Sequence, residues 1–381
     1  MKHSLLTLLP LIEPALGPDL VPAAALTNVK RYLARLPLLS GGLLECPLGD
    51  RQRAVDLALR ATAADGGFRW LAEASGIEEA FGDGEAWQRL REFARRRNQA
   101  THPLHKAVKE AWLEFDLDGG EALKPPNLFF GLDEQVGRPP LLGPEVAARL
   151  AEALATIRDG LEALGVTINP AREGLLGRLL KERPAPSRLS YVGVMLARQT
   201  PGYRLTLDRV PLSELTGYLR DVGWPHAREP VAGVINFLLD HVKYVALHLD
   251  TDEQVLSRIG MEVSFEQTVD QVAAWKRFLQ ALAAIGLCAP AKAEAAHNWP
   301  AYFHPQNLRD RWPESLPRTS SYFARSINHV KLTYDPGTSP AAGGAFTPIS
   351  IQSAVGGLSA KIYLAFNYGS TIPRSILSRA R

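Results

Sequence analysis

Hydrophobic and polar residues alternate strictly in five separate parts of the chain, and each part is broken by turn-forming or polar residues into two short segments. Alternation with a period of two is typical of β-strands that bury one face. The pattern therefore predicts five pairs of antiparallel strands. The predicted pairs are 43–48 with 54–60, 111–117 with 127–132, 191–198 with 203–208, 244–250 with 259–265, and 329–334 with 360–366.

Apolar residues at the spacing of an amphipathic helix precede and separate these strand pairs. In residues 144–182, for example, Leu150, Leu154, Ile157 and Leu161 recur at intervals of three or four. The other stretches of helical spacing are 4–38, 67–109, 212–240 and 267–286. The order of elements is thus helices and then a strand pair, five times over, with little sequence identity between the units.

Antiparallel strand pairs with helices on one face can leave no exposed edge if they close on themselves. We therefore expect an α+β fold in which residues 1–381 form a single domain. Its five αββα repeats build a ten-stranded antiparallel β-barrel, with the helices as an outer ring. Ten strands make a wider barrel than the roughly eight strands that side chains just fill. The interior is accordingly predicted to be a chamber that binds a ligand.

Strand neighbours point to opposite faces, so the alternation sorts the strand residues into two sets. The apolar set, expected to face the helices, is Val55, Leu57, Leu59, Leu113, Phe115, Leu117, Val192, Val194, Leu196, Val245, Leu247, Leu249, Val330, Leu332, Ile362, Leu364 and Phe366. The polar set, expected to line the chamber, is Glu45, Asp56, Arg60, Glu114, Asp116, Tyr191, Arg204, Thr206, Asp208, His248, Glu262, Ser264, His329, Lys331, Thr333, Lys361 and Tyr363.

Composition narrows the class of protein. The 43 Lys and Arg residues nearly balance the 40 Asp and Glu residues, so no clustered positive charge predicts nucleic-acid binding. No run of about 18 apolar residues predicts a membrane span. The two cysteines, Cys46 and Cys288, lie far apart, which argues against a disulfide framework and fits a reducing cytoplasm. The apolar run 4–12 is interrupted by Pro10 and predicts a first amphipathic helix rather than a secretory signal.

Short segments of the predicted inner face resemble motifs of a known enzyme family. The segment Leu44-Glu45-Cys46-Pro47-Leu48 is similar to the strand that opens with a carboxylate in indole-type aromatic prenyltransferases of the αββα, or PT-barrel, family. Lys361-Ile362-Tyr363 resembles the Lys-x-Tyr pairs with which that family grips a prenyl diphosphate. His329-Val330-Lys331 and Arg204 would supply further cations. The arrangement of five αββα units resembles the same family over nearly the whole chain.

The resemblance implies a transferase of natural-product biosynthesis that moves a prenyl group from an allylic diphosphate to an aromatic or peptide side chain. Such a reaction needs cations and Tyr donors for the diphosphate, aromatic faces for the allyl cation, and a carboxylate as general base. The resemblance assigns the base to Glu45. It assigns the diphosphate contacts to Arg204, Lys331, Lys361 and Tyr363.

Carboxylates outnumber cations in the predicted chamber. Glu114 and Asp116 lie two residues apart on one strand face, as a metal ion or a guanidinium requires, and are further candidates for catalysis. So many carboxylates would repel a diphosphate unless Mg²⁺ bridged them. The excess also leaves open a barrel that has lost diphosphate binding and modifies or holds a cationic side chain or a peptide. The remaining candidates for substrate contact are Tyr191, His248, Glu262 and His329.

Two long connections, 287–327 and 335–359, are candidates for segments that close the chamber. No Gly-x-Gly-x-x-Gly, P-loop or Gly-x-Ser-x-Gly motif occurs in the chain, so no nucleotide cofactor is expected.

Overall fold

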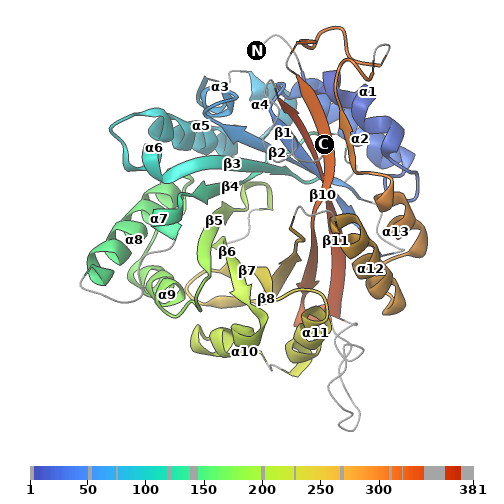
Figure 1. Cartoon of the computed structure of the whole chain (residues 1–381). Helices are drawn as coiled ribbons and strands as arrows, with labels where there is room; N and C mark the ends of the chain where they lie inside the picture. Colours follow the sequence, from blue (N-terminus) through green and yellow to red (C-terminus); the bar gives the residue numbers. More distant parts are fainter. Residues whose placement is uncertain are drawn as a thin grey trace.

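The computed structural model shows a barrel of β-strands with helices around its outside (Figure 1). It describes residues 4–49, 54–73, 76–117, 120, 122–137, 145–198, 202–226, 229–266, 270–308, 311–319, 321–338 and 357–369.

The strands follow one another around the barrel in chain order, and every neighbouring pair is antiparallel. The barrel strands are β1 (Gly41–Pro47), β2 (Asp56–Thr62), β3 (Val108–Phe115), β4 (Asn127–Leu132), β5 (Arg188–Val194), β6 (Tyr203–Pro211), β7 (Tyr244–Thr251), β8 (Val255–Val263), β10 (Tyr322–Tyr334) and β11 (Leu358–Gly369). Strand β11 pairs with both β10 and β1, which closes the barrel. A short strand, β9 (Ala301–Phe303), pairs with the beginning of β10. The predicted ten-stranded barrel is confirmed.

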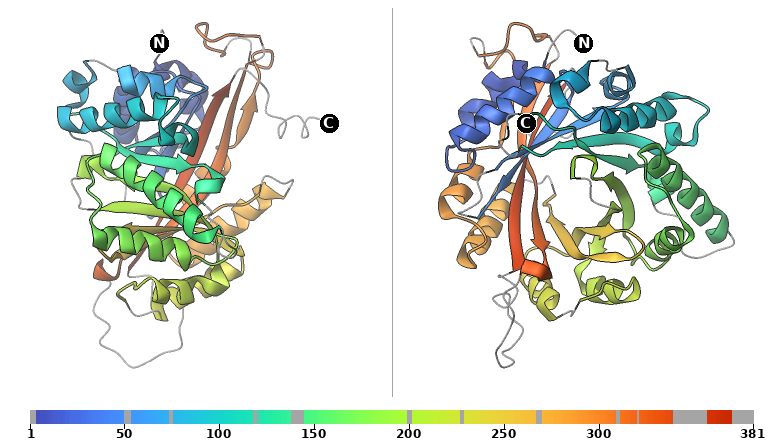
Figure 2. Two further views of the ribbon diagram at one scale, coloured as in Figure 1. Left: turned by 90° about the vertical axis from the view of Figure 1, so that its left-hand side faces the viewer. Right: turned by 180° about the vertical axis from the view of Figure 1, so that it is seen from behind.

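Helices cover the outside of the barrel between the strand pairs, as the two further views show (Figure 2). The α-helices are α1 (Leu9–Ile12), α2 (Ala23–Arg35), α3 (Gly67–Glu73), α4 (Ile77–Phe81), α5 (Gly84–Asn98), α6 (Pro103–Ala107), α7 (Glu134–Gly137), α8 (Val146–Ala163), α9 (Pro170–Lys181), α10 (Leu212–Asp221), α11 (Glu229–Leu239), α12 (Gln271–Ala284) and α13 (Pro290–His297). Short 3₁₀ turns are η1 (Leu5–Leu8), η2 (Glu13–Ala15), η3 (Leu196–Arg198) and η4 (Pro336–Thr338).

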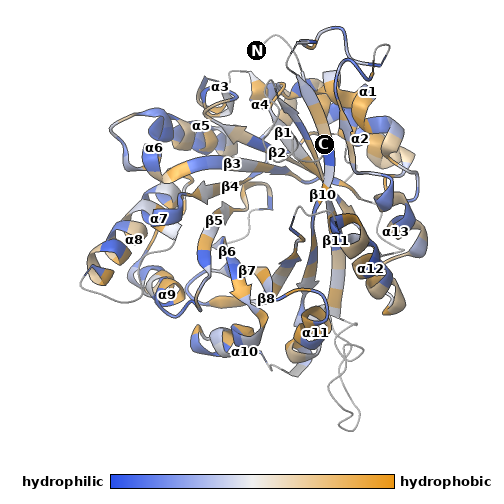
Figure 3. Ribbon diagram, viewed as in Figure 1, coloured by the Kyte–Doolittle hydropathy of each residue, from blue (hydrophilic) through white to orange (hydrophobic). Residues whose placement is uncertain are grey.

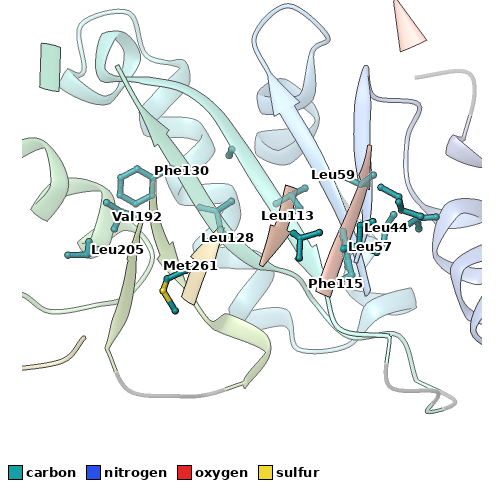
Figure 4. Packing of buried hydrophobic residues seen from close by; sticks show 14 of the residues in the cluster. Leu44, Leu57, Leu59, Leu113, Phe115, Leu128, Phe130, Val192, Leu205 and Met261 are labelled. Atoms are coloured by element: carbon teal, nitrogen blue, oxygen red, sulfur yellow. The ribbon is translucent and has the colours of Figure 1, made fainter. Parts of the chain in front are cut away.

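The main hydrophobic core lies between the strands and the helices. Every apolar strand residue predicted to face the helices is buried in this one cluster. Figure 4 shows part of it, with Leu57, Leu59, Leu113, Phe115 and Phe130 among the labelled side chains. Helices and strands carry hydrophobic and hydrophilic residues side by side (Figure 3), as expected for elements that bury one face. Each fully buried Leu or Phe contributes roughly 1.5–3 kcal/mol of transfer free energy, so this layer fixes the barrel's shape.

The apolar N-terminal run packs into the core, but not as one helix. Leu5, Leu8, Leu11 and Ile12 are buried, and the chain passes through η1, α1 and η2 before the longer α2 begins. Pro10 lacks an amide N–H, which favours several short turns over one continuous helix. Among the described residues, no helix is long and apolar enough to cross a membrane. Cys46 and Cys288 are both buried, and no disulfide joins them.

Two sequence-based expectations about the connections need correction. The strand predicted at 191–198 ends at Val194, and η3 turns Leu196–Arg198 away from the strand direction. The connection predicted at 287–327 contains α13, β9 and the beginning of β10. For the connection 335–359, residues 339–356 lie outside the described residues, as do the turn residues 50, 118–119 and 200–201.

Candidate active site in the barrel lumen

A cavity of about 150 Å³ lies inside the barrel, and all ten barrel strands contribute to its wall. We call it the lumen cavity. Its lining residues are Leu43, Glu45, Ala58, Trp112, Glu114, Phe129, Tyr191, Thr206, His248, Glu262, Asn328, His329, Lys331 and Tyr363. Nine of the seventeen residues predicted for the inner face therefore line one cavity.

Glu45 is the most deeply buried carboxyl group of the cavity wall, at 2% exposure. Its strand neighbours across β1 are Asp56 and Tyr363. The Tyr363 hydroxyl hydrogen-bonds its carboxyl, and the Lys361 ammonium lies 3.7 Å from Oε2. Burial raises the pKa of Glu45 to about 8, helped by the negative charge of Glu114 and opposed by Lys361. The Glu45 carboxyl is thus protonated near neutral pH.

The raised pKa predicts how stability depends on pH. The unfolded chain loses the Glu45 proton near its ordinary pKa of 4.5, whereas the folded chain keeps it until about 8. The contribution of Glu45 to the free energy of unfolding is therefore fully present below 4.5 and is lost as pH rises to about 8. Glu45→Gln cannot ionise, so its melting temperature should rise relative to wild type as the pH increases over this range.

Calorimetric melting curves at several pH values between about 5 and 9 would test this expectation. Asp208→Asn is the matched control, because Asp208 lies at the barrel rim with its side chain 38% exposed and pairs with Arg188. A difference between Glu45→Gln and wild type that stays constant with pH would contradict a proton-bearing buried carboxyl.

Four cations lie around one end of the cavity. Three of them, Arg204, Lys331 and Lys361, were predicted from the sequence, and the fourth is Arg198. Each lies beside a carboxylate or an imidazole. Lys361 Nζ lies 2.8 Å from Asp56 Oδ2. Arg204 forms a bidentate pair with Asp250, with Nε–Oδ1 at 2.5 Å and Nη2–Oδ2 at 3.1 Å. Arg204 overcomes the burial of Asp250 and lowers the pKa of that carboxyl to about 2. The predicted cations are thus present, but they already have acidic partners.

The fourth cation is Arg198, which sequence reasoning placed on a strand. Because η3 folds back toward the lumen, its Nη2 lies 2.5 Å from Glu114 Oε1 and its Nε lies 2.8 Å from Asp116 Oδ2. This guanidinium outweighs burial and lowers the pKa of Asp116. The sequence predicted either a metal ion or a guanidinium beside Glu114 and Asp116, and in the structure the guanidinium of Arg198 lies there. Among the described residues, no group of three or more His, Cys, Asp or Glu side chains is placed to hold a metal ion.

Glu262 is flanked by two imidazoles inside the cavity. Its Oε1 lies 2.6 Å from His248 Nε2 and 3.3 Å from His329 Nε2. Burial alone would raise the pKa of Glu262, but the two imidazoles hold it well below its usual range. Lys331 Nζ lies 3.1 Å from His248 Nδ1, and an ammonium can only donate. His248 therefore accepts at Nδ1 and carries its proton on Nε2, the nitrogen that faces the ionised Glu262.

A β-bulge shapes the neighbouring part of the wall. The pairing of β10 with β11 shifts register between Ile327 and His329, so Asn328 and His329 both line the cavity. Asn328 Nδ2 lies 2.9 Å from His329 Nδ1, and the His329 ring stacks on Tyr363 with centroids 3.9 Å apart. The bulge thus orients His329 between an amide, a phenol ring and Glu262.

Two inward-facing glycines make room for long side chains. A Cβ at Gly260 would lie 2.7 Å from Lys331 Cε, and a Cβ at Gly193 would lie 2.4 Å from the Phe129 ring. Only glycine therefore lets these side chains cross the neighbouring strands. Burial, followed by the charge of Arg204, lowers the pKa of Lys331 to about 8.

Aromatic rings form much of the remaining wall. Trp112, Phe129, Tyr191 and Tyr363 all line the cavity, and the Tyr191 hydroxyl hydrogen-bonds Glu110. These rings exclude water and present faces that attract cations. The cavity therefore combines ionisable groups with shielding from solvent.

The structure does not bring every predicted lining residue into the cavity. Asp208 lies at the rim beside Arg188, and Ser264 is exposed beyond the end of β8. Ser264 follows the last residue of β8, whereas Asp208 lies within β6 and pairs with Arg188, the first residue of β5.

Sequence reasoning also missed several residues of the site. Trp112 and Asp250 share the inward alternation of Glu114 and His248, so the period-two pattern contained the signal that would have found them. Asn328 depends on the bulge and Arg198 on η3, and no period in the sequence reveals either.

This chain is distantly similar to several solved structures. No protein-family model and no curated protein matches the chain. Among solved structures, the prenyltransferase PriB in its apo form aligns over 95% of this chain and 94% of its own, with a TM-score of 0.49 and 13% identity. PriB in a ternary complex with L-tryptophan and dimethylallyl thiolodiphosphate aligns over the same fractions of the two chains, with a TM-score of 0.47 and 12% identity. The prenyltransferase NotF aligns over 88% of this chain and 81% of its own, with a TM-score of 0.39 and 14% identity.

Proposed function

We propose that this protein transfers a prenyl group from an allylic diphosphate to an acceptor bound in the lumen cavity, as in natural-product biosynthesis. The supporting observation is the composition of the lumen cavity and its surroundings. A buried carboxyl, aromatic rings and Lys331 line the cavity, and Arg198, Arg204 and Lys361 lie next to it, each paired with a carboxylate. Ionisation of an allylic diphosphate requires cations for the leaving group and exclusion of water from the carbocation. The cavity offers both beside a group that can remove a proton.

Each side chain has a distinct role in this proposal. Arg204, Lys331 and Lys361 would stabilise the charge that develops on the departing diphosphate, together with the Tyr363 hydroxyl. Phe129 would face the allyl cation, which aromatic rings stabilise by roughly 0.5–2 kcal/mol each. Glu45 lies beside Tyr363 and Lys361 and would take the proton from the acceptor.

The diphosphate would have to exchange partners with the carboxylates already present. Arg204 and Lys361 would release Asp250 and Asp56 in part as phosphate oxygens approach. Magnesium is usually held by one or two carboxylates together with phosphate oxygens.

One observation favours a second candidate function. The cations Arg198, Arg204 and Lys361 are each paired with a carboxylate, which suits a lumen that binds a peptide or modifies it without any diphosphate. This alternative uses the same cavity and predicts no affinity for prenyl diphosphates.

Calorimetric titration with dimethylallyl and geranyl diphosphate, with and without Mg²⁺, separates the two functions. Prenyl transfer predicts binding that Arg204→Ala weakens roughly tenfold or more, because hydrogen bonds to charged groups contribute about 1.5–3 kcal/mol. Asp208→Asn, at the rim, should bind as wild type does. Absence of binding under both conditions would contradict prenyl transfer and leave the peptide function.

A further inference from the structure

The wall of the lumen cavity carries more carboxyl groups than cations. Of the residues that line it, Glu45, Glu114 and Glu262 bring three carboxyls, whereas Lys331 brings the only ammonium or guanidinium. Arg204 and Lys361 lie beyond this lining, paired with aspartates. A buried carboxylate is costly unless an opposite charge compensates it. Arg198 already compensates Glu114, and His248, His329 and Lys331 surround Glu262. The nearest ammonium to Glu45, that of Lys361, is shared with Asp56, so Glu45 is the carboxyl that a positively charged ligand would newly stabilise in its ionised form.

The donor makes this imbalance larger. An allylic diphosphate adds about three negative charges to a lumen whose cations already serve carboxylates. A neutral acceptor would leave that excess uncompensated, whereas a cationic acceptor would reduce it. The charge balance of the ternary complex thus favours a positively charged acceptor.

The shape and chemistry of the wall favour a planar cation. The side chains of Trp112, Phe129, Tyr191 and Tyr363 line the cavity, and planar guanidinium groups stack on aromatic rings. The protein already binds one guanidinium at the edge of this space, because Glu114 and Asp116 accept hydrogen bonds from Arg198. Carboxylates placed in this way match the fork of N–H donors on a guanidinium.

We propose that the acceptor is the guanidinium of an arginine side chain, held between Glu45 and Glu114 against the aromatic walls. This inference rests on the proposed function for its donor, but acceptor binding can be measured without the donor.

The transfer step balances as follows. The C1–O bond of the allylic diphosphate breaks, and its electron pair leaves with the diphosphate. A guanidinium nitrogen forms the new bond to C1 while its N–H proton moves to the Glu45 carboxylate. The product is an N-prenyl guanidinium that keeps one positive charge, and no oxidant or reductant is required.

The protonation of Glu45 supports a cationic acceptor. Burial and the charge of Glu114 raise the pKa of Glu45 to about 8, so a neutral acceptor would meet a protonated group at neutral pH. A guanidinium placed beside Glu45 favours the ionised carboxyl and restores its capacity to act as a base. Binding of such an acceptor should therefore release a proton.

The experiment compares N-acetyl-arginine amide with N-acetyl-citrulline amide, its uncharged isostere, by calorimetric titration into the whole protein near pH 7. We expect the arginine probe to bind at least about tenfold more tightly, a difference of about 1.4 kcal/mol. Titration in buffers of different ionisation enthalpy should show release of up to about one proton with arginine and none with citrulline. Equal affinity for the two probes, or tighter binding of N-acetyl-tryptophan amide, would overturn the inference.

Variants test whether the measured affinity and proton release come from the lumen cavity. Glu45→Gln should weaken the arginine probe about tenfold or more and abolish proton release, while citrulline affinity stays unchanged. Asp208→Asn should leave the affinity for both probes and the proton release as in wild type, since Asp208 lies at the rim. If the arginine probe fails but a prenyl diphosphate binds, the acceptor assignment is wrong and prenyl transfer stands. If arginine binds with proton release and no diphosphate binds, prenyl transfer is wrong and the guanidinium site stands.

Discussion

Replacing Glu45 with Gln is expected to lower the rate of the proposed prenyl transfer by roughly 10²–10⁴-fold, the usual contribution of a general base. Glutamine keeps the size of the side chain and its contact with Tyr363, but it cannot accept the proton of the acceptor. At saturating acceptor the loss should appear in the turnover number, in addition to the weaker acceptor binding expected for this variant, because the amide still fills the same place in the wall. Single-turnover formation of the prenylated product, followed by mass spectrometry, would measure it.

The pH profile identifies the group responsible. Because Glu45 must lose its proton before it can act, kcat/KM of the wild type should rise with pH toward the pKa of about 8. Lys331, with a pKa also near 8, must keep its proton to hold the diphosphate, so the rate should fall again above that value. Glu45→Gln should lose the rising limb and keep the falling one. A Glu45→Gln enzyme with full turnover would show that another group is the base.

Trp299→Ala is expected to cost about 3–5 kcal/mol of the free energy of unfolding, a large part of the ~5–15 kcal/mol typical of a domain. Trp299 is fully buried, and its indole N–H lies 3.1 Å from both the Ser326 and Ala365 carbonyl oxygens. The Arg325 guanidinium lies over its ring. One side chain therefore contacts both β10 and β11, the strands that close the barrel.

Urea unfolding followed by circular dichroism would measure this loss. Tyr302→Ala is the matched aromatic control: Tyr302 lies on β9 and is 38% exposed, so we expect a change below about 0.5 kcal/mol. The loss in the free energy of unfolding for Trp299→Phe should lie between those of Trp299→Ala and Tyr302→Ala, because phenylalanine keeps most of the buried area but loses the N–H donor. A Trp299→Ala protein as stable as wild type would contradict the role of this residue in barrel closure.

The barrel was predictable because its strands bury one face along their whole length. Leu57, Leu59 and Leu113 alternate with Asp56 and Glu114, and this period of two specifies both strand and inward direction without any tertiary information. The register between strands, which decides which side chains meet, is set by packing at distances that the sequence does not show.

The candidate site was predictable only where the alternation persists. Glu45, Lys331 and Tyr363 lie on regular strands and meet at the cavity as expected. Arg198 reaches the lumen because the chain leaves the strand at Val194, a local change of direction that depends on the surrounding packing. Sequence reasoning therefore found the carboxylates on β3 but not the arginine that they bind.

The pairing of β1 with β11 also has a consequence for synthesis. Glu45 and Tyr363 are direct neighbours in this pair although most of the chain separates them. During translation β1 leaves the ribosome long before its partner exists, so an unpaired edge stays available to other nascent chains. We expect release from the ribosome to precede formation of the binding chamber, and expression to depend on chaperones that shield this edge. Fragments that end before β11 should aggregate rather than bind any ligand.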